Sequence, residues 1–193
     1  MKYAFAIPAK LGITDSQDAL PVYIQQHALL RMAERLSMQN GLILFTISLF
    51  FNGKPNAIHT KSGHLITFDY NEKKLGYLVV DLIDHKIIIK TFLFLTNDGT
   101  PEGEKLASIT KLKKLDKKFL DLDTLKGISK LAIKEHSELY KLFSEAGCAD
   151  LFELTDLTTF LDMDSVQKNP DMLLKYLQDN HFFLSFSKTE NQK

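Results

Sequence analysis

The chain has 193 residues, and its 24 lysines and arginines balance 24 aspartates and glutamates, so its formal net charge is zero. Hydrophobic residues make up 45% of the composition, which excludes wholesale disorder and collagen-like repeats. The length predicts one domain, or a domain with a smaller appendage. A zero net charge provides no global field for nucleic acid or a membrane, although a local patch can still form one.

Cysteine content and hydropathy predict a cytoplasmic protein. The single cysteine, Cys148, cannot form an intrachain disulfide, which fits a reducing compartment. The apolar run near the N-terminus stops at Lys10 and is too short for a secretory signal. The longest apolar run, residues 42–51, covers half of a membrane span and is interpreted as a buried strand. We therefore expect no membrane partner.

The first hundred residues are predicted to form a helix and a sheet. Alternating apolar residues at positions 3–7 indicate a short strand. From residue 22 to about 38, apolar residues recur every four positions and predict an amphipathic helix. Residues 42–95 are rich in β-branched and aromatic residues joined by short turns, which favours an antiparallel meander. The expected strands span residues 42–51, 57–60, 64–70, 75–83 and 86–95.

The second half is predicted to be mostly helical. Helices are expected near residues 102–112, 123–146 and 170–178, with one or two short helices in 151–163 and a final strand at 182–186. The fold class is thus α+β: an N-terminal helix on an antiparallel β-meander, followed by a mostly helical C-terminal region. A soft boundary separates a helix-plus-sheet domain (1–100) from a helical region (101–193), and the two could also form one domain.

Charge is segregated along this second half. Residues 105–134 carry nine lysines and three aspartates, whereas residues 135–171 carry two lysines and nine acids. We favour the interpretation that the basic block pairs with the acidic block, although it could also attract a phosphate backbone. The basic block has no arginine and only one aromatic residue, Phe119, so it is a poor platform for stacking single-stranded bases.

The most informative polar residues lie on the first predicted helix. His27, Arg31 and Glu34 share one helical face, and Arg35 lies one turn beyond Arg31. Arginine binds phosphate oxygens in a bidentate manner, and histidine transfers protons near neutral pH. Metal-free RNA cleavage needs a base for the 2′-hydroxyl and cations for the developing phosphorane charge. The same residues also fit an ordinary solvated helix face with an Arg31–Glu34 pair.

The pattern His27-Ala28-x-x-Arg31-Met32-x-x-Arg35, followed by strands, resembles the opening helix of toxin-like domains in the barnase/RelE-like ribonuclease group. The resemblance covers about residues 20–95 and departs from the group at Leu36-Ser37, where a glycine and a β-branched residue are usual. It implies a toxin-like, metal-independent ribonuclease acting on RNA. In such a domain His27 would be the general acid or base, and Arg31 and Arg35 would clamp the phosphate.

Two other functions stay open. One is a non-enzymatic protein-interaction module, or an inactive relative of such a domain, that binds a protein partner through the helical half. The other is a small-molecule binder with a sheet-lined pocket. The sequence contains no phosphate-binding glycine loop or dinucleotide fingerprint, so we expect no cofactor. His59 and His64 flank a turn, but nothing specifies a third ligand, and we expect no metal.

Overall fold

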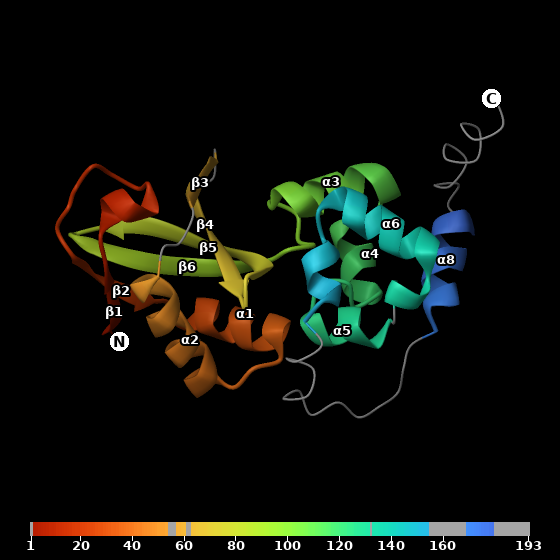
Figure 1. The fold of residues 1–193 in the computed structure, drawn as a ribbon, viewed down its shortest axis with the longest axis horizontal. Coiled ribbons are helices and arrows are strands. Elements are labelled where there is room, and N and C mark those ends of the chain that lie inside the picture. Colours follow the sequence, from red (N-terminus) through yellow and green to blue (C-terminus); the bar gives the residue numbers. More distant parts are fainter. Residues whose placement is uncertain (1, 54–56, 61–62, 132, 155–168, 180–193) are drawn as a thin grey trace. The chain divides into compact units, whose positions relative to one another are not determined.

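The computed structural model describes residues 2–53, 57–60, 63–131, 133–154 and 169–179 (Figure 1). The chain folds as two compact units that divide between Leu95 and Thr96. We call them the sheet unit and the helical unit. The strand expected at 182–186 and most of the region 151–163 lie outside the described residues. Taken together, the two units confirm the α+β class.

The sheet unit is built on a six-stranded sheet with the order β1-β2-β6-β5-β4-β3. The strands are β1 (Lys2–Ala6), β2 (Leu20–Ile24), β3 (Ala57–Thr60), β4 (Gly63–Tyr70), β5 (Lys73–Ile83) and β6 (Lys86–Phe94). Strands β3 to β6 form the predicted antiparallel meander. However, β2 pairs with β6 in parallel, so the prediction of a purely antiparallel sheet is wrong. Parallel pairing is feasible because two helices and three strands separate β2 from β6, which supplies the long connection it needs.

Residues 42–51, predicted to be a strand, instead belong to helix α2 (Asn40–Asn52). The helix contains no charged residue, and its apolar residues are spread over all of its sides. The sequence therefore lacks the polar–apolar repeat by which an amphipathic helix is usually recognised. The buried residues Ile43, Ile47 and Phe51 recur every four positions, as one helical face requires. The α2 helix packs against β1, and the ring centroid of Phe50 lies 5.2 Å from that of Phe68 on β4.

The first predicted helix starts later than expected. Helix α1 (Gln26–Leu36) begins after β2, in which Val22 and Ile24 are buried at alternate positions. The N–H of Gln25 donates to the carbonyl of Ile89 at 3.0 Å, so pairing with β6 continues to the start of the helix. A short 3₁₀ helix, η1 (Pro8–Leu11), lies between β1 and β2. The predicted apolar face of α1 is buried at Ala28, Met32 and Leu36.

The described residues of the helical unit form short helices. They are α3 (Pro101–Thr110), α4 (Lys114–Phe119), α5 (Leu125–Lys130), η2 (Ile133–Glu135), α6 (Ser137–Ala146), η3 (Ala149–Phe152) and α8 (Pro170–Asp179). Helix α8 confirms the prediction for residues 170–178. The single helix predicted over 123–146 is wrong, because the extended backbone of His136 separates α6 from η2 and α5.

Two helices of this unit begin in the same way. The side-chain oxygen of Thr100 accepts a hydrogen bond from the N–H of Gly103, and that of Thr124 accepts one from Gly127, each at 2.9 Å. A Cβ atom on these glycines would lie only 1.9 Å and 1.8 Å, respectively, from a preceding backbone carbonyl oxygen. In both cases the Thr-x-x-Gly sequence supplies the cap through threonine and the close approach through glycine.

Candidate functional site

The predicted catalytic residues lie on α1, but they differ in exposure. His27 and Arg31 are exposed one turn apart, and the structure gives neither a hydrogen bond nor an ion pair with a described residue. Arg35 is only 7% exposed and has an interaction partner. The structure therefore brings His27 and Arg31 together on one solvent-accessible face and places Arg35 in the interior. Their catalytic roles stay predictions.

The two histidines considered as metal ligands lie opposite each other, because His59 pairs with His64 in the register of β3 and β4. Over the part of the chain that the structure describes, no group of three or more His, Cys, Asp or Glu side chains could hold a metal ion. No helix in that part is long and apolar enough to cross a bilayer.

Helix α4 of the helical unit inverts the usual placement of polar and apolar side chains. Lys117 is 1% exposed, whereas Leu115 and Phe119 are 77% and 82% exposed. The two apolar residues are four positions apart and therefore project from the same side of the helix. Folded chains usually bury large apolar side chains and expose lysine. The reverse arrangement on α4 therefore indicates a binding surface.

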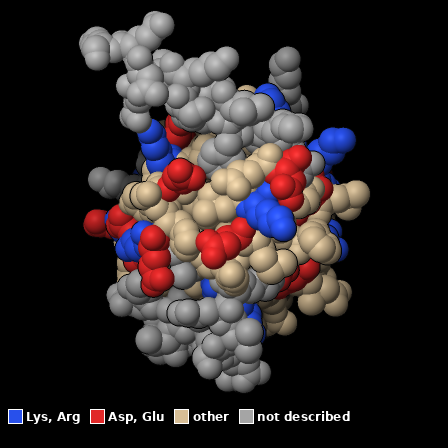
Figure 2. Space-filling model, turned by 90° about the vertical axis from the view of Figure 1, so that its right-hand side faces the viewer, with Lys and Arg blue, Asp and Glu red and all other residues tan. Residues whose placement is uncertain are grey.

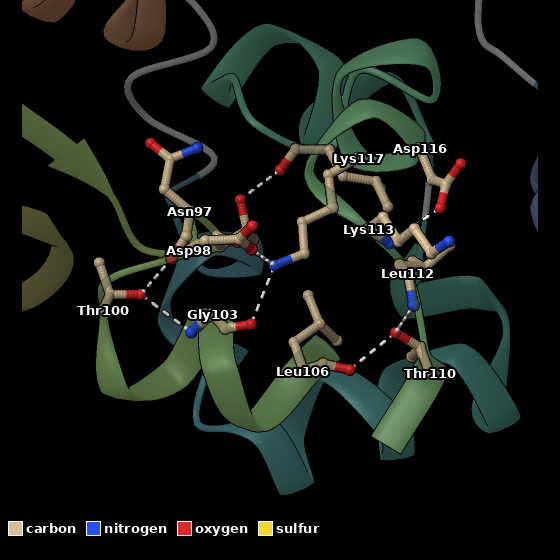
Figure 3. Close-up of polar contacts among 12 residues, drawn as sticks. Asn97, Asp98, Thr100, Gly103, Leu106, Thr110, Leu112, Lys113, Asp116 and Lys117 are labelled. Carbon is tan, nitrogen blue, oxygen red and sulfur yellow. Dashed lines mark hydrogen bonds and ion pairs between the residues drawn. The ribbon is translucent and has the colours of Figure 1, made fainter. Parts of the chain in front are cut away.

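The buried lysine holds α4 to the start of α3. Its ammonium group donates to the backbone carbonyls of Thr96 at 3.0 Å and Gly103 at 2.9 Å, and it pairs with the carboxylate of Asp98 at 2.6 Å (Figure 3). Each of the three ammonium protons of Lys117 thus has an acceptor. This complete set of partners offsets the cost of removing the charge from water.

Asp116 holds α4 through two further hydrogen bonds. One carboxylate oxygen accepts from the N–H of Lys113 at 2.8 Å, and the other accepts from the hydroxyl of Tyr176 on α8 at 3.0 Å. The hydrogen bond to Asp116 raises the pKa of Tyr176 above the ordinary value of 10.0, and desolvation and the carboxylate charge act in the same direction. Asp116 and Lys117 thus anchor α4, while Leu115 and Phe119 remain exposed.

Cationic side chains flank the exposed apolar pair. The exposed lysines nearest to it in the sequence are Lys111, Lys113, Lys114 and Lys118. None of the four forms an ion pair with a described residue, and their expected pairing with the acidic block stays a prediction. We call these four lysines, Leu115 and Phe119 the α4 patch. On the face of the molecule shown in Figure 2, acidic and basic side chains are interspersed.

Sequence reasoning missed the α4 patch. Leu115 and Phe119 have the spacing of an ordinary buried stripe, so the pattern predicts that they face the core. Nothing in the sequence distinguishes Lys117 from its neighbours, because its burial depends on carbonyl groups of residues far from it in the chain. The one usable signal was the concentration of lysines around two apolar residues in a stretch too short for an independent helix.

Together, the fold and the site define a two-unit α+β protein with an exposed apolar and basic surface on its helical unit. No model of a known protein family matches the chain, and neither a curated protein nor a solved structure matches it.

Proposed function

We propose that the protein is a non-enzymatic interaction module that binds a protein partner through the α4 patch of its helical unit. The observation that carries this proposal is the inversion of α4, in which the polar Asp116 and Lys117 are anchored while Leu115 and Phe119 face solvent. An apolar pair flanked by cations is complementary to an apolar groove bordered by carboxylates.

The two kinds of side chain in the patch would have different effects on binding. Burying Leu115 and Phe119 in a partner would contribute about 1.5–3 kcal/mol each, so they would account for most of the affinity. The four lysines remain near the rim, where charges mainly increase the association rate and select an acidic partner. Binding should therefore depend on salt through its association rate, and on the apolar pair through its dissociation rate.

The test is affinity purification with the full chain, followed by titration of the captured and purified partner. The double variant Leu115→Ser/Phe119→Ser should weaken binding at least tenfold, because both apolar contacts are lost. The triple variant Lys113→Gln/Lys114→Gln/Lys118→Gln should slow association and reduce its dependence on salt. Circular dichroism would verify that the variants fold, as is expected for exposed positions.

Ile83→Ser is the matched control, since Ile83 is another exposed apolar residue (47%) and lies in the sheet unit. Equal affinity of the control and the Leu115/Phe119 variant for every captured protein would refute the proposal. Loss of capture after nuclease treatment would show that RNA bridges the captured proteins to this chain, which would also refute the proposal.

A second candidate function is favoured by the exposure of His27 and Arg31 on one face of α1. It is the metal-independent cleavage of RNA that the resemblance to toxin-like domains implies. His27 would transfer the proton and Arg31 would bind the phosphate. Arg35 would have to reach the phosphate from its buried position.

This second function predicts that the purified protein degrades RNA in the presence of a metal chelator. His27→Ala should abolish cleavage without lowering the melting temperature, because His27 is exposed. If the wild type does not cleave RNA, or if the variant cleaves it equally well, this function is excluded.

A further inference from the structure

Helix α2 has large apolar side chains on both of its faces. The inner face is buried through Ile43, Ile47 and Phe51, and the helix contains no charged residue. The outer face exposes Leu42 by 45%, Phe45 by 60% and Leu49 by 55%. We call these three residues the α2 seam. Exposed apolar residues that occur singly are ordinary, but a row of three on one uncharged helix indicates a contact surface.

The α2 seam has the geometry of a helix-pairing surface. Its residues are spaced three and four positions apart, which is the spacing of coiled-coil contact positions. The pattern is nearly symmetric, with a leucine on either side of a central phenylalanine. A two-fold axis near Phe45 would therefore place Leu42 of one copy opposite Leu49 of a second copy, and bring the two Phe45 rings together.

We propose that the α2 seam binds the α2 seam of a second copy of this chain, as an antiparallel helix pair. Charge supports this occupant: an uncharged seam brings no like charges together when it pairs with itself, and it offers nothing to attract an acidic or basic partner. The helix dipoles of an antiparallel pair are also oppositely oriented, which is favourable. Helices that lie on membranes carry lysine or arginine on their polar face, and α2 has neither.

The exposed area determines how strong this contact would be. If a fully exposed Leu or Phe side chain presents roughly 150–250 Å², the seam offers roughly 300 Å² per copy. The resulting total of about 600 Å² is less than the roughly 1,000 Å² expected of a stable interface. Leu30 on α1 and Phe5 on β1 are also about half exposed, and both elements pack against α2. We therefore expect the dimer to be weak and to dissociate when the protein is diluted to low micromolar concentration. This dimer does not involve the α4 patch.

Sedimentation equilibrium of the full chain tests the dimer. Between about 5 and 500 µM, where a weak complex should form, the average mass of the wild type should rise from 22.0 kDa toward twice that value. Phe45→Ser should keep the mass of one chain, whereas the control Ile83→Ser should behave as the wild type. A wild-type mass of 22.0 kDa at every concentration would overturn the proposal.

Disulfide trapping tests the antiparallel arrangement. Cys148 is buried, so an introduced cysteine would be the accessible thiol. Phe45→Cys should form a disulfide-linked dimer much faster than the control Glu34→Cys on α1. A mixture of Leu42→Cys and Leu49→Cys chains should form mixed dimers faster than either variant forms dimers alone. Faster self-linking of Leu42→Cys than mixed linking would indicate parallel helices and overturn the proposed arrangement.

Discussion

The two units of the protein differ in how they satisfy their buried backbone groups. In the sheet unit, the polar or charged residues that the structure shows as buried are Arg35 and Thr67. In the helical unit they are Thr96, Thr100, Thr110, Lys117 and Asp123. Strands of a sheet satisfy one another, but each helix end leaves up to four N–H or C=O groups without partners. Because the described α-helices of the helical unit span only six to ten residues, much of their backbone lies near an end. Short helices thus need polar side chains near their ends, and Thr100, whose hydroxyl accepts from the N–H of Gly103 in the first turn of α3, is the clearest example.

The largest effect is expected from Lys117→Met, which keeps the length of the side chain and removes its charge. The buried carbonyls of Thr96 and Gly103 would lose their donor, whereas Asp98 is 45% exposed and can be hydrated. We expect the free energy of unfolding of the helical unit to fall by about 3 kcal/mol. Hydrogen exchange in a urea series should show this loss in the helical unit and leave the sheet unit protected. An equal loss in both units would contradict the comparison.

The corresponding change in the sheet unit is Gly76→Ala. A Cβ at Gly76 would lie 2.1 Å from the carbonyl oxygen of Leu93 across the β5–β6 pair, so the strands would have to separate. We expect a loss of about 2 kcal/mol, confined to the sheet unit. Gly41→Ala is the matched control: it lies in α2 with no neighbour within 4 Å of the added Cβ, and it should be neutral or stabilising. Hydrogen exchange resolved by unit measures both variants.

A smaller effect is expected from Thr124→Val, which removes a helix cap and preserves the shape of the side chain. The N–H of Gly127 would lose its acceptor, and the helical unit should lose about 1 kcal/mol. Thr100→Val should have a larger effect on α3, because the buried Thr100 hydroxyl also donates to the carbonyl of Asn97 at 2.8 Å. The measurement is the midpoint of urea unfolding at constant slope. Thr91→Val on strand β6 is the control, because Thr91 caps no helix. If this variant lowered the urea midpoint equally, loss of the helix cap would not explain the loss of stability.

The smallest effect concerns the pH dependence of the helical unit. Because the hydrogen bond to Asp116 raises the pKa of Tyr176, the folded chain holds this proton more tightly than the unfolded chain does. The resulting stabilisation is present below the unfolded pKa and is lost as pH rises through the folded one. Tyr176→Phe should make stability less sensitive to alkaline pH. The difference in phenolate absorbance between the wild type and the variant reports the ionisation of Tyr176. Its midpoint should lie above pH 10.0, and a midpoint at or below that pH would contradict the hydrogen bond.

The sequence predicts those elements whose signals are local. Strands β3 to β6 have apolar patterns separated by short turns, and antiparallel pairing of neighbouring strands follows from those turns. Nothing within residues 20–24 selects a partner at residues 87–89, so the parallel β2–β6 pair was not predicted. Apolar residues recur every four positions from residue 24 to residue 36, so the helical pattern of α1 includes Ile24, which belongs to β2.

The candidate site was predictable only in part. The four-residue spacing of Ala28, Met32 and Leu36 places His27 and Arg31 away from the buried face of α1, as the structure shows. Arg35 lies three positions after Met32, at the border of that face, and spacing alone cannot determine whether a border residue is buried. The inversion of α4 does not follow from residue spacing, because it depends on which of nine lysines reaches the carbonyls of the loop preceding α3 and its first turn.

The parallel pairing of β2 with β6 has a consequence for synthesis of the chain on the ribosome. Val22 pairs with Ile87, so β2 can pair with β1 early but gains its second neighbour only when nearly the whole sheet unit has been translated. Contacts between such distant segments form slowly, and domains generally fold as units when their last element emerges. Until β6 is available, the uncharged helix α2 lacks the completed sheet that buries its inner face. We therefore expect a nascent chain that ends just before residue 87 to leave the inner face of α2 incompletely covered.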